Sequence, residues 1–418
     1  MRSIVWLILL AVLAVVAATS LGQNDGIVSI YWLGWRADVS FNLFLLTLVL
    51  AFVAIHTLMR GLGGLLTLPD KARRWRLSQR DRQAQAALRD ALSLYMAGRY
   101  TRAHKACQRA VAIQADTPEL KLDAEFTALA HLLSAGSLHR LQDRPRRDEH
   151  LQRAVELGRL ARGTRAAEEG ARLLAAECAL DDRDAGRALR DLAELPPGVA
   201  RRTQALRMKL QATRQAHLPL EALRTARLLA KHQGFSPGAA EGLLRTLAQE
   251  TLDQARDTDQ LRQLWLELDA QDRKDPLVAA RAAERMASLG APHEARQWLA
   301  PFWDKLGTLS VDGLDAMARA LRHARSGLES EWLPRLDTAA GMALRHPALA
   351  LSVGLALTER QLWGKARSLL LSAANDSALA APLRRQAWAA LGRLAEHNQQ
   401  PEEAARCFRQ AALADDAR

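Results

Sequence analysis

The sequence predicts an all-α protein in which a hairpin of two transmembrane helices precedes an α-solenoid of about nine helix pairs. Three observations predict this fold class. Two long apolar runs lie near the N-terminus, small residues recur at a regular spacing through the rest of the chain, and long alternating strand patterns are hard to find. With 418 residues, the chain exceeds one compact core, so an elongated array or several domains are expected.

The clearest repeat unit lies in residues 386–412. Its first predicted helix carries Trp388 and Gly392, and its second carries Ala404 and Phe408. The small residues let two antiparallel helices approach each other, while the two aromatic side chains fill the space beside them. The pattern and its length match a tetratricopeptide unit. One such unit cannot bury its own apolar face, so neighbouring units must stack on it.

Weaker copies of this unit begin near residue 83. Each copy has a small residue shortly after a predicted turn between two helices, at Ala103, Ala188, Ala222, Ala295, Ala366 and Ala404. Ala188 and Ala222 are 34 residues apart, which is one repeat. Gly98 and Gly290 fit helix ends between units. Residues 84–418 are therefore expected to form one tetratricopeptide-like solenoid.

The transmembrane hairpin is predicted in residues 1–68. Residues 3–24 contain no charge, and residues 39–59 contain His56 as their single ionisable group, so both runs are long enough to span a bilayer. The alternative is a cleaved signal peptide followed by one span, because Arg2 and an apolar run also begin such peptides. The second apolar run favours the uncleaved hairpin. Pro69 is expected to stop or kink the membrane helix.

Basic residues predict the orientation of the hairpin. Arg2 precedes the first run and many basic residues follow the second, whereas the connection at about residues 25–38 carries few. Both termini and the repeat domain should therefore be cytoplasmic and the connection periplasmic. Residues 69–83 form a basic juxtamembrane segment that can lie against anionic lipid head groups. A solvated helix start that acts only as a topology signal is the alternative. The basic residues assigned to the membrane interface are Arg60, Arg73, Arg74 and Arg76.

The short connection is rich in β-branched and aromatic residues on both sides of a glycine, which predicts a small β-hairpin. Tyr31, Trp32 and Trp35 are expected at the level of the lipid head groups, where aromatic side chains are enriched. A ligand-binding role for these aromatic residues is the alternative.

A family resemblance emerges from these features. The chain resembles the HemY family of proteobacterial inner-membrane proteins in its two N-terminal spans and its cytoplasmic repeat array. The two spans are linked by Asn24-Asp25-Gly26-Ile27-Val28, with Trp35 and Val39-Ser40 downstream. The distinctive sequence lies in roughly the first hundred residues. The resemblance implies an inner-membrane location and an association with late protohaem IX biosynthesis. It implies no catalytic residue, and the chain does not resemble the flavin-dependent protoporphyrinogen oxidase that shares the label in other bacteria.

The sequence contains no recognisable catalytic or metal motif. The segment Gly61-Leu62-Gly63-Gly64-Leu65-Leu66 has two glycines of a dinucleotide fingerprint but lacks the third, and it follows a membrane helix instead of a strand. Cys107, Cys178 and Cys407 lie far apart, which indicates a reducing compartment and argues against a zinc site. We expect no cofactor or metal, with His56 as a weak candidate for binding haem. An interfacial or helix-packing role for His56 is the alternative.

The net charge of +12 predicts an anionic partner, and lipid head groups fit it better than nucleic acid because no stripe of basic and aromatic residues is present. In tetratricopeptide arrays the first helices of successive pairs line a groove that binds peptides or proteins. Arginine side chains there suit the carboxylates of a partner segment or, alternatively, porphyrin propionates; a merely solvated surface is the third possibility. The predicted groove residues are Arg89, Glu177, Gln204, Arg207, Gln211, Arg214, Arg281, Glu284 and Arg393.

These features together predict a membrane-anchored, non-catalytic scaffold for partner proteins. By resemblance, the partners are enzymes of haem biosynthesis. The alternatives are direct porphyrin or haem binding, an enzyme of porphyrin oxidation without a recognisable cofactor motif, and nucleic-acid binding through the positive charge. Nucleic-acid binding would predict an affinity that collapses with salt.

Overall fold

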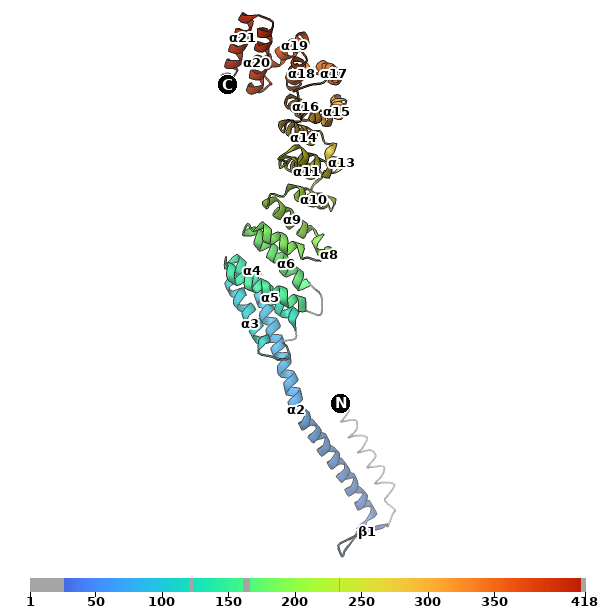
Figure 1. Cartoon of the computed structure of the whole chain (residues 1–418). Helices are drawn as coiled ribbons and strands as arrows, with labels where there is room; N and C mark the ends of the chain where they lie inside the picture. Colours follow the sequence, from blue (N-terminus) through green and yellow to red (C-terminus); the bar gives the residue numbers. More distant parts are fainter. Residues whose placement is uncertain (1–25, 121–122, 161–165, 233, 415–418) are drawn as a thin grey trace. The chain divides into compact units, whose positions relative to one another are not determined.

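The structure is a computed structural model that describes residues 26–120, 123–160, 166–232 and 234–414, with backbone alone for residues 60–69. The chain divides into two compact units, Met1–Leu141 and Gln142–Arg418. Apart from one two-stranded sheet, the regular structure of the described residues is helical (Figure 1). The all-α prediction is confirmed. The first predicted span, in residues 3–24, lies outside the described residues.

The described part of the first unit begins with the predicted β-hairpin. Strands β1 (Ile27–Trp32) and β2 (Trp35–Ser40) pair in antiparallel register. Leu33 and Gly34 form the two-residue turn, with φ angles of 46° and 89° that match the right-handed twist of a hairpin. Ser29 lies opposite Asp38 and donates a hydrogen bond of 2.5 Å from its hydroxyl. This hydrogen bond, and a second from Arg36, lower the pKa of Asp38.

Helix α2 (Phe41–Met96) follows the hairpin directly. The Ser40 hydroxyl caps it by accepting a hydrogen bond from the backbone N–H of Leu43. Its first part, Phe41–Met59, has a mean hydropathy of 2.2 and no buried residue, and it is the one candidate membrane span among the described residues. The helix continues through Pro69 without ending, so residues 69–83 belong to the same helix as the span. A proline removes one backbone hydrogen bond, which is compatible with a helix that goes on.

The C-terminal part of α2 packs against α3 (Tyr100–Ala115) and α4 (Ala124–Arg140). Ala84, Ala87 and Ala91 are buried on the inner face of α2. A short side chain at each of these positions lets α3 approach the α2 backbone closely.

The second unit consists of successive helices joined by short turns. In chain order these are α5 (Arg144–Leu160), α6 (Ala166–Asp181), α7 (Ala185–Ala193), α8 (Pro197–Ala200), α9 (Thr203–Gln215), α10 (Pro219–Lys231), α11 (Pro237–Asp253), α12 (Thr258–Glu267), α13 (Ala270–Arg273), α14 (Pro276–Ser288), α15 (Pro292–Trp303), η1 (Leu306–Thr308), α16 (Val311–His323), η2 (Ser330–Trp332), α17 (Leu333–Ala343), α18 (Pro347–Glu359), α19 (Trp363–Asn375), α20 (Ala381–His397) and α21 (Pro401–Leu413). Several begin with proline, whose missing N–H costs nothing at the first helical position.

The helices of the second unit stack in two layers. Helix α14 packs on α16, α16 on α18 and α18 on α20, while α15, α19 and α21 pack beside their predecessors in the chain. In Figure 1, α11, α14, α16 and α18 follow one another in one layer, and α13, α15 and α17 lie in the other. This is a helical-repeat architecture, in which each unit buries its apolar face against its neighbours.

The turns between paired helices explain the spacing of small residues in the sequence. A residue with positive φ lies five positions before each predicted post-turn alanine, in the pairs Gly98 and Ala103, Arg183 and Ala188, His217 and Ala222, Gly290 and Ala295, Gln361 and Ala366, and Gln399 and Ala404. All six alanines are buried, which confirms the prediction. The following amide returns to the end of the first helix, as in the 3.1 Å bond from Leu362 N to Leu357 O. Each pair is therefore closed by the same left-handed cap.

Two glycines mark the closest approach of paired helices. A methyl group on Gly392 of α20 would lie 2.7 Å from the Phe408 ring on α21, and one on Gly354 of α18 would lie 2.9 Å from Leu370 Cγ on α19. The predicted close contact at Gly392 is confirmed.

Arginine–carboxylate pairs connect successive helix pairs. The two residues of each pair lie about one repeat apart in the chain. These pairs are Arg262–Glu294, Arg296–Glu329, Arg325–Glu359 and Arg367–Glu403. Many arginines are therefore used inside the array, between repeats. From the sequence, arginines were expected in the groove, at the membrane interface or on a solvated surface, and these pairs between repeats were not predicted.

Candidate functional site

The first candidate site is a cleft beside α9. Arg207, Gln211 and Arg214 lie along one exposed face of this helix because they are spaced three to four residues apart. Together with Leu210, Gln215, Leu229 and Phe235 they line a cleft of about 470 Å³. Gln204 is exposed one turn earlier on the same helix. Three of the predicted groove residues are thus brought together, over a floor that includes apolar side chains.

The arginines of this cleft differ from most others in the array. Arg207 donates a long hydrogen bond of 3.5 Å to the backbone oxygen of Gly234. Among the described residues, no carboxylate lies within ion-pair distance of Arg207 or Arg214. Their guanidinium groups are therefore available to an anionic group from outside the chain.

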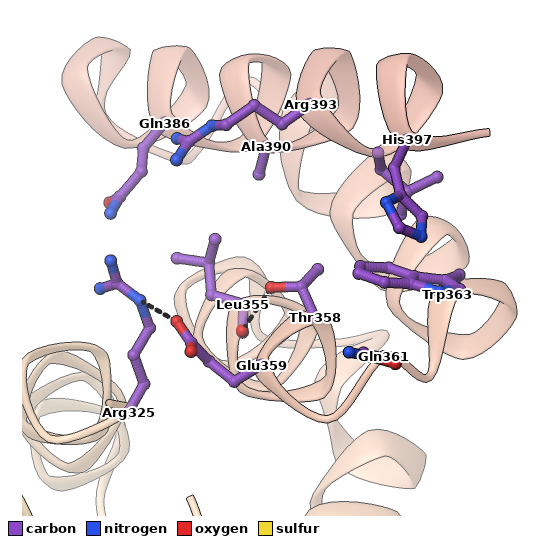
Figure 2. A pocket seen from close by; sticks show the side chains of 11 residues that line it. Arg325, Leu355, Thr358, Glu359, Gln361, Trp363, Gln386, Ala390, Arg393 and His397 are labelled. Carbon is purple, nitrogen blue, oxygen red and sulfur yellow. Dashed lines mark hydrogen bonds and ion pairs between the residues drawn. The ribbon is translucent and has the colours of Figure 1, made fainter. Parts of the chain in front are cut away.

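The second candidate site is a cleft of about 360 Å³ between α18 and α20 (Figure 2). Of the predicted groove residues, it contains Arg393. Helix α20 also contributes Gln386, Ala390, Leu394 and His397, helix α18 contributes Leu355, Thr358 and Glu359, and Arg325, Gln361 and Trp363 complete the lining. These other residues were not predicted from the sequence, because α18 and α20 come together only when the helices stack.

The α18–α20 cleft has a charged end and an aromatic end. At the charged end, Arg325 Nε lies 3.3 Å from a carboxylate oxygen of Glu359, and Arg393 and Gln386 face them from α20 (Figure 2). At the aromatic end, the rings of Trp363 and His397 are 4.6 Å apart, centroid to centroid, and tilted by 40°. The arrangement can hold a group that is anionic on one side and apolar on the other.

Two predicted groove residues belong instead to an ion-pair chain between helices. Arg281 of α14 pairs with Asp253 of α11 at 2.8 Å and with Glu284 at 3.3 Å. Glu284 is buried and also pairs with Arg319 of α16 at 2.8 Å. These contacts join three stacked helices, so both side chains already have partners within the array.

The remaining predicted groove residues lie outside both clefts. Arg89 is exposed on α2 in the first unit, and Glu177 is half-buried on α6. The predicted set is therefore not one continuous surface.

The aromatic residues assigned to the membrane interface are all exposed. Tyr31, Trp32 and Trp35 on the hairpin are 71%, 72% and 83% exposed. Large apolar side chains are rarely exposed to water together, so we expect another apolar surface to cover these three residues.

The predicted basic interface residues lie on α2. Arg73, Arg74 and Arg76 are exposed, and the side chain of Arg60 lies outside the described residues. Trp75, which was not predicted as an interface residue, is 65% exposed among them. A tryptophan beside basic residues is a typical combination at a membrane surface.

The haem candidate His56 lies on the apolar part of α2. Its ring is exposed and stacks on Phe52, with 6.2 Å between the centroids. In the described part of the chain, no three His, Cys, Asp or Glu side chains gather as a metal-binding group.

The cysteines are buried and free. Burial raises the pKa of the Cys107 thiol to about 11 and that of Cys178 to about 12. Such thiols are protonated at neutral pH and are poor nucleophiles.

Comparison with known proteins found one family model. Residues 26–135 match the model described as HemY protein N-terminus, which covers the hairpin, α2, α3 and most of α4. A search of curated proteins found no match.

Proposed function

We propose that this chain, in which residues 26–135 match the model of the HemY protein N-terminus, is a membrane-anchored, non-catalytic scaffold that binds partner proteins through its helical array. In this proposal the anchor is a hairpin of two spans in the bacterial inner membrane, and the tetratricopeptide-like array faces the cytoplasm. The family resemblance suggests enzymes of late protohaem IX biosynthesis as the partners.

Membrane anchoring is supported by α2. Its apolar segment Phe41–Met59 has 19 residues, and at 1.5 Å per residue it is about 28 Å long, close to the thickness of a bilayer core. None of it is buried against protein. Exposed aromatic residues precede the segment, and exposed arginines follow it from Arg73 onward on the same helix; both kinds of side chain are suited to a membrane surface. The arginines favour a cytoplasmic location for the helical array.

Partner binding is supported chiefly by the α9 cleft. Many arginines elsewhere in the array, among them Arg262, Arg281 and Arg296, pair with carboxylates of neighbouring helices. Arg207 and Arg214 instead line a cleft with apolar side chains, without a carboxylate partner among the described residues. A partner segment with a carboxylate and an apolar side chain would satisfy both features.

The test compares two double variants in native membranes. R207Q/R214Q removes the charge of the cleft, and R406Q/R409Q removes the same charge from exposed positions of α21. After chemical crosslinking in membranes, purification and mass spectrometry, we expect the partner proteins to be lost from the first variant and retained by the second. Equal recovery from both variants would contradict the assignment of the cleft. A Soret band or a flavin spectrum in the purified wild-type protein would instead support the porphyrin-handling alternative.

A further inference from the structure

The charged end of the α18–α20 cleft carries more positive than negative charge. Arg325 and Arg393 face one carboxylate, that of Glu359 (Figure 2). Arg393 donates from Nε to the backbone oxygen of Ala389 at 3.3 Å, and no carboxylate among the described residues lies within ion-pair distance of it. One guanidinium of the pair therefore lacks a counter-charge.

The ion pair between Arg325 and Glu359 is weak. The two side chains are 36% and 39% exposed, so water screens their attraction. Arg325 is nevertheless held in place, because its Nη1 donates a 2.7 Å hydrogen bond to the backbone oxygen of Arg322. A second carboxylate could therefore reach a guanidinium whose orientation is already set.

Arg322, whose backbone oxygen accepts the hydrogen bond from Arg325, is itself a buried cation. Arg322 is 9% exposed, and its Nη1 donates a 3.1 Å hydrogen bond to the Ser352 hydroxyl of α18. Among the described residues, no carboxylate is within ion-pair distance of Arg322 either. A buried charge without a partner is unfavourable, so a negative group brought to the neighbouring cleft would be attracted.

The other end of the cleft suits an apolar side chain. Trp363 is half-buried and presents its ring beside His397, and Leu355 and Ala390 between the two ends are buried. Aromatic side chains provide large contact areas with little loss of conformational freedom.

We infer that this cleft binds an acidic peptide segment of a partner protein. A carboxylate of the segment lies between Arg325 and Arg393, and a neighbouring apolar side chain lies against Trp363. The inference rests on the proposed scaffold function and specifies the chemistry of one contact. Two guanidinium groups can hold a carboxylate through several charge-assisted hydrogen bonds. The aromatic end distinguishes such a segment from a small inorganic anion, which would use the charged end alone.

The test measures fluorescence anisotropy with full-length protein in a neutral detergent. The probes are three labelled decapeptides, one with alternating glutamate and leucine, one with glutamine in place of glutamate, and one with glycine in place of leucine. We expect the glutamate–leucine peptide to bind, and the other two to bind at least about tenfold more weakly, because each lacks one of the two contacts.

Variants then distinguish binding from a structural role. R393Q and R325Q should weaken binding of the glutamate–leucine peptide by about tenfold or more. E359Q should strengthen it several-fold, because it removes the carboxylate that competes for Arg325. R325Q and E359Q break the same ion pair, so a purely structural role would move the affinity in the same direction for both. R409Q, on an exposed position of α21, should leave the affinity unchanged.

Three results would overturn the inference: no binding of the glutamate–leucine peptide, binding that none of the three cleft variants changes, or displacement of the peptide by a single-stranded oligonucleotide of equal charge. None of these affects crosslinking through the α9 cleft, which tests the scaffold function separately. Equal recovery of partners from R207Q/R214Q and R406Q/R409Q, with peptide binding intact, would instead contradict the wider proposal.

Discussion

Replacing Gly354 by alanine should loosen the contact between α18 and α19. The added methyl group would lie 2.9 Å from Leu370 Cγ and 3.0 Å from Cδ2, closer than side chains normally approach. Leu370 is fully buried, so it has no free space into which it can turn. Either the leucine leaves its preferred rotamer or the two helices move apart.

The expected loss follows from two opposing effects. Alanine in place of glycine stabilises a helix interior by about 1 kcal/mol, whereas overpacking costs about 1–3 kcal/mol. We expect a net destabilisation of about 1 kcal/mol. Gly242 of α11 provides the matched control, because no atom lies within 4 Å of a methyl group added there, and its replacement should stabilise the helix. At Gly392 the cost should be smaller, because Phe408 is 37% exposed and its ring can turn outward.

Hydrogen exchange of backbone amides is the suitable assay, since repeat arrays open locally. In full-length protein in detergent, Gly354→Ala should accelerate exchange in α18 and α19 by roughly fivefold, and Gly242→Ala should slow it in α11. Combining Gly354→Ala with Leu370→Ala should cost about 1 kcal/mol less than the sum of the single losses, because the shortened side chain leaves room for the methyl group. Slower exchange in the Gly354→Ala variant would refute the close approach of the two helices.

Three further predictions concern buried or half-buried groups. Arg296 is 1% exposed and donates hydrogen bonds to Glu329 and to the backbone oxygens of Ser326 and Gly327. Arg296→Leu leaves these acceptors without a donor, so it should lower the free energy of unfolding by about 3–5 kcal/mol. We expect faster hydrogen exchange in α15 and α16, and unchanged exchange would contradict the structural role of Arg296. The hydrogen bond from Arg296 lowers the pKa of Glu329 from 4.5 to about 2. The contribution of the Glu329 carboxylate to stability is therefore complete above pH 4.5 and is lost as the pH falls toward 2. Glu329→Gln should remove this part of the acid sensitivity, and an identical pH profile of thermal unfolding in the variant would contradict this prediction. The Cys107 thiol is buried, and burial raises its pKa to about 11. It should therefore react with maleimide at pH 7 about 100-fold more slowly in the folded protein than in urea. Equal rates would show that the α2–α3 contact is open.

The repeat pattern was readable from the sequence where small residues carry it. Gly392 and the six post-turn alanines are needed wherever two backbones approach, and few other side chains fit there. The hairpin was predictable because Gly34 lies between two β-branched and aromatic segments.

Other features left little trace in the sequence. Four of the left-handed turn residues, Arg183, His217, Gln361 and Gln399, are not glycine and give no turn signal. Pro69 was expected to stop or kink the membrane helix, and the sequence did not decide between the two; α2 continues through it.

The α18–α20 cleft also could not be predicted. Arg325 meets Glu359 only after the helices stack, since the two residues are 34 positions apart and arginine is common throughout the chain. The same stacking of helices decides whether an arginine is paired with a carboxylate of the array, as Arg281 is, or available to a partner, as Arg207 is.

The most direct test of the scaffold function is photocrosslinking in native membranes. A photoreactive amino acid is placed at Gln211 in the α9 cleft or, as a control, at Leu228, which is 49% exposed on α10. We predict a discrete product of higher mass in the membrane fraction from position 211, its loss when Arg214→Gln is added, and no such product from position 228. No product from position 211, or the same products from both positions, would contradict partner binding through this array.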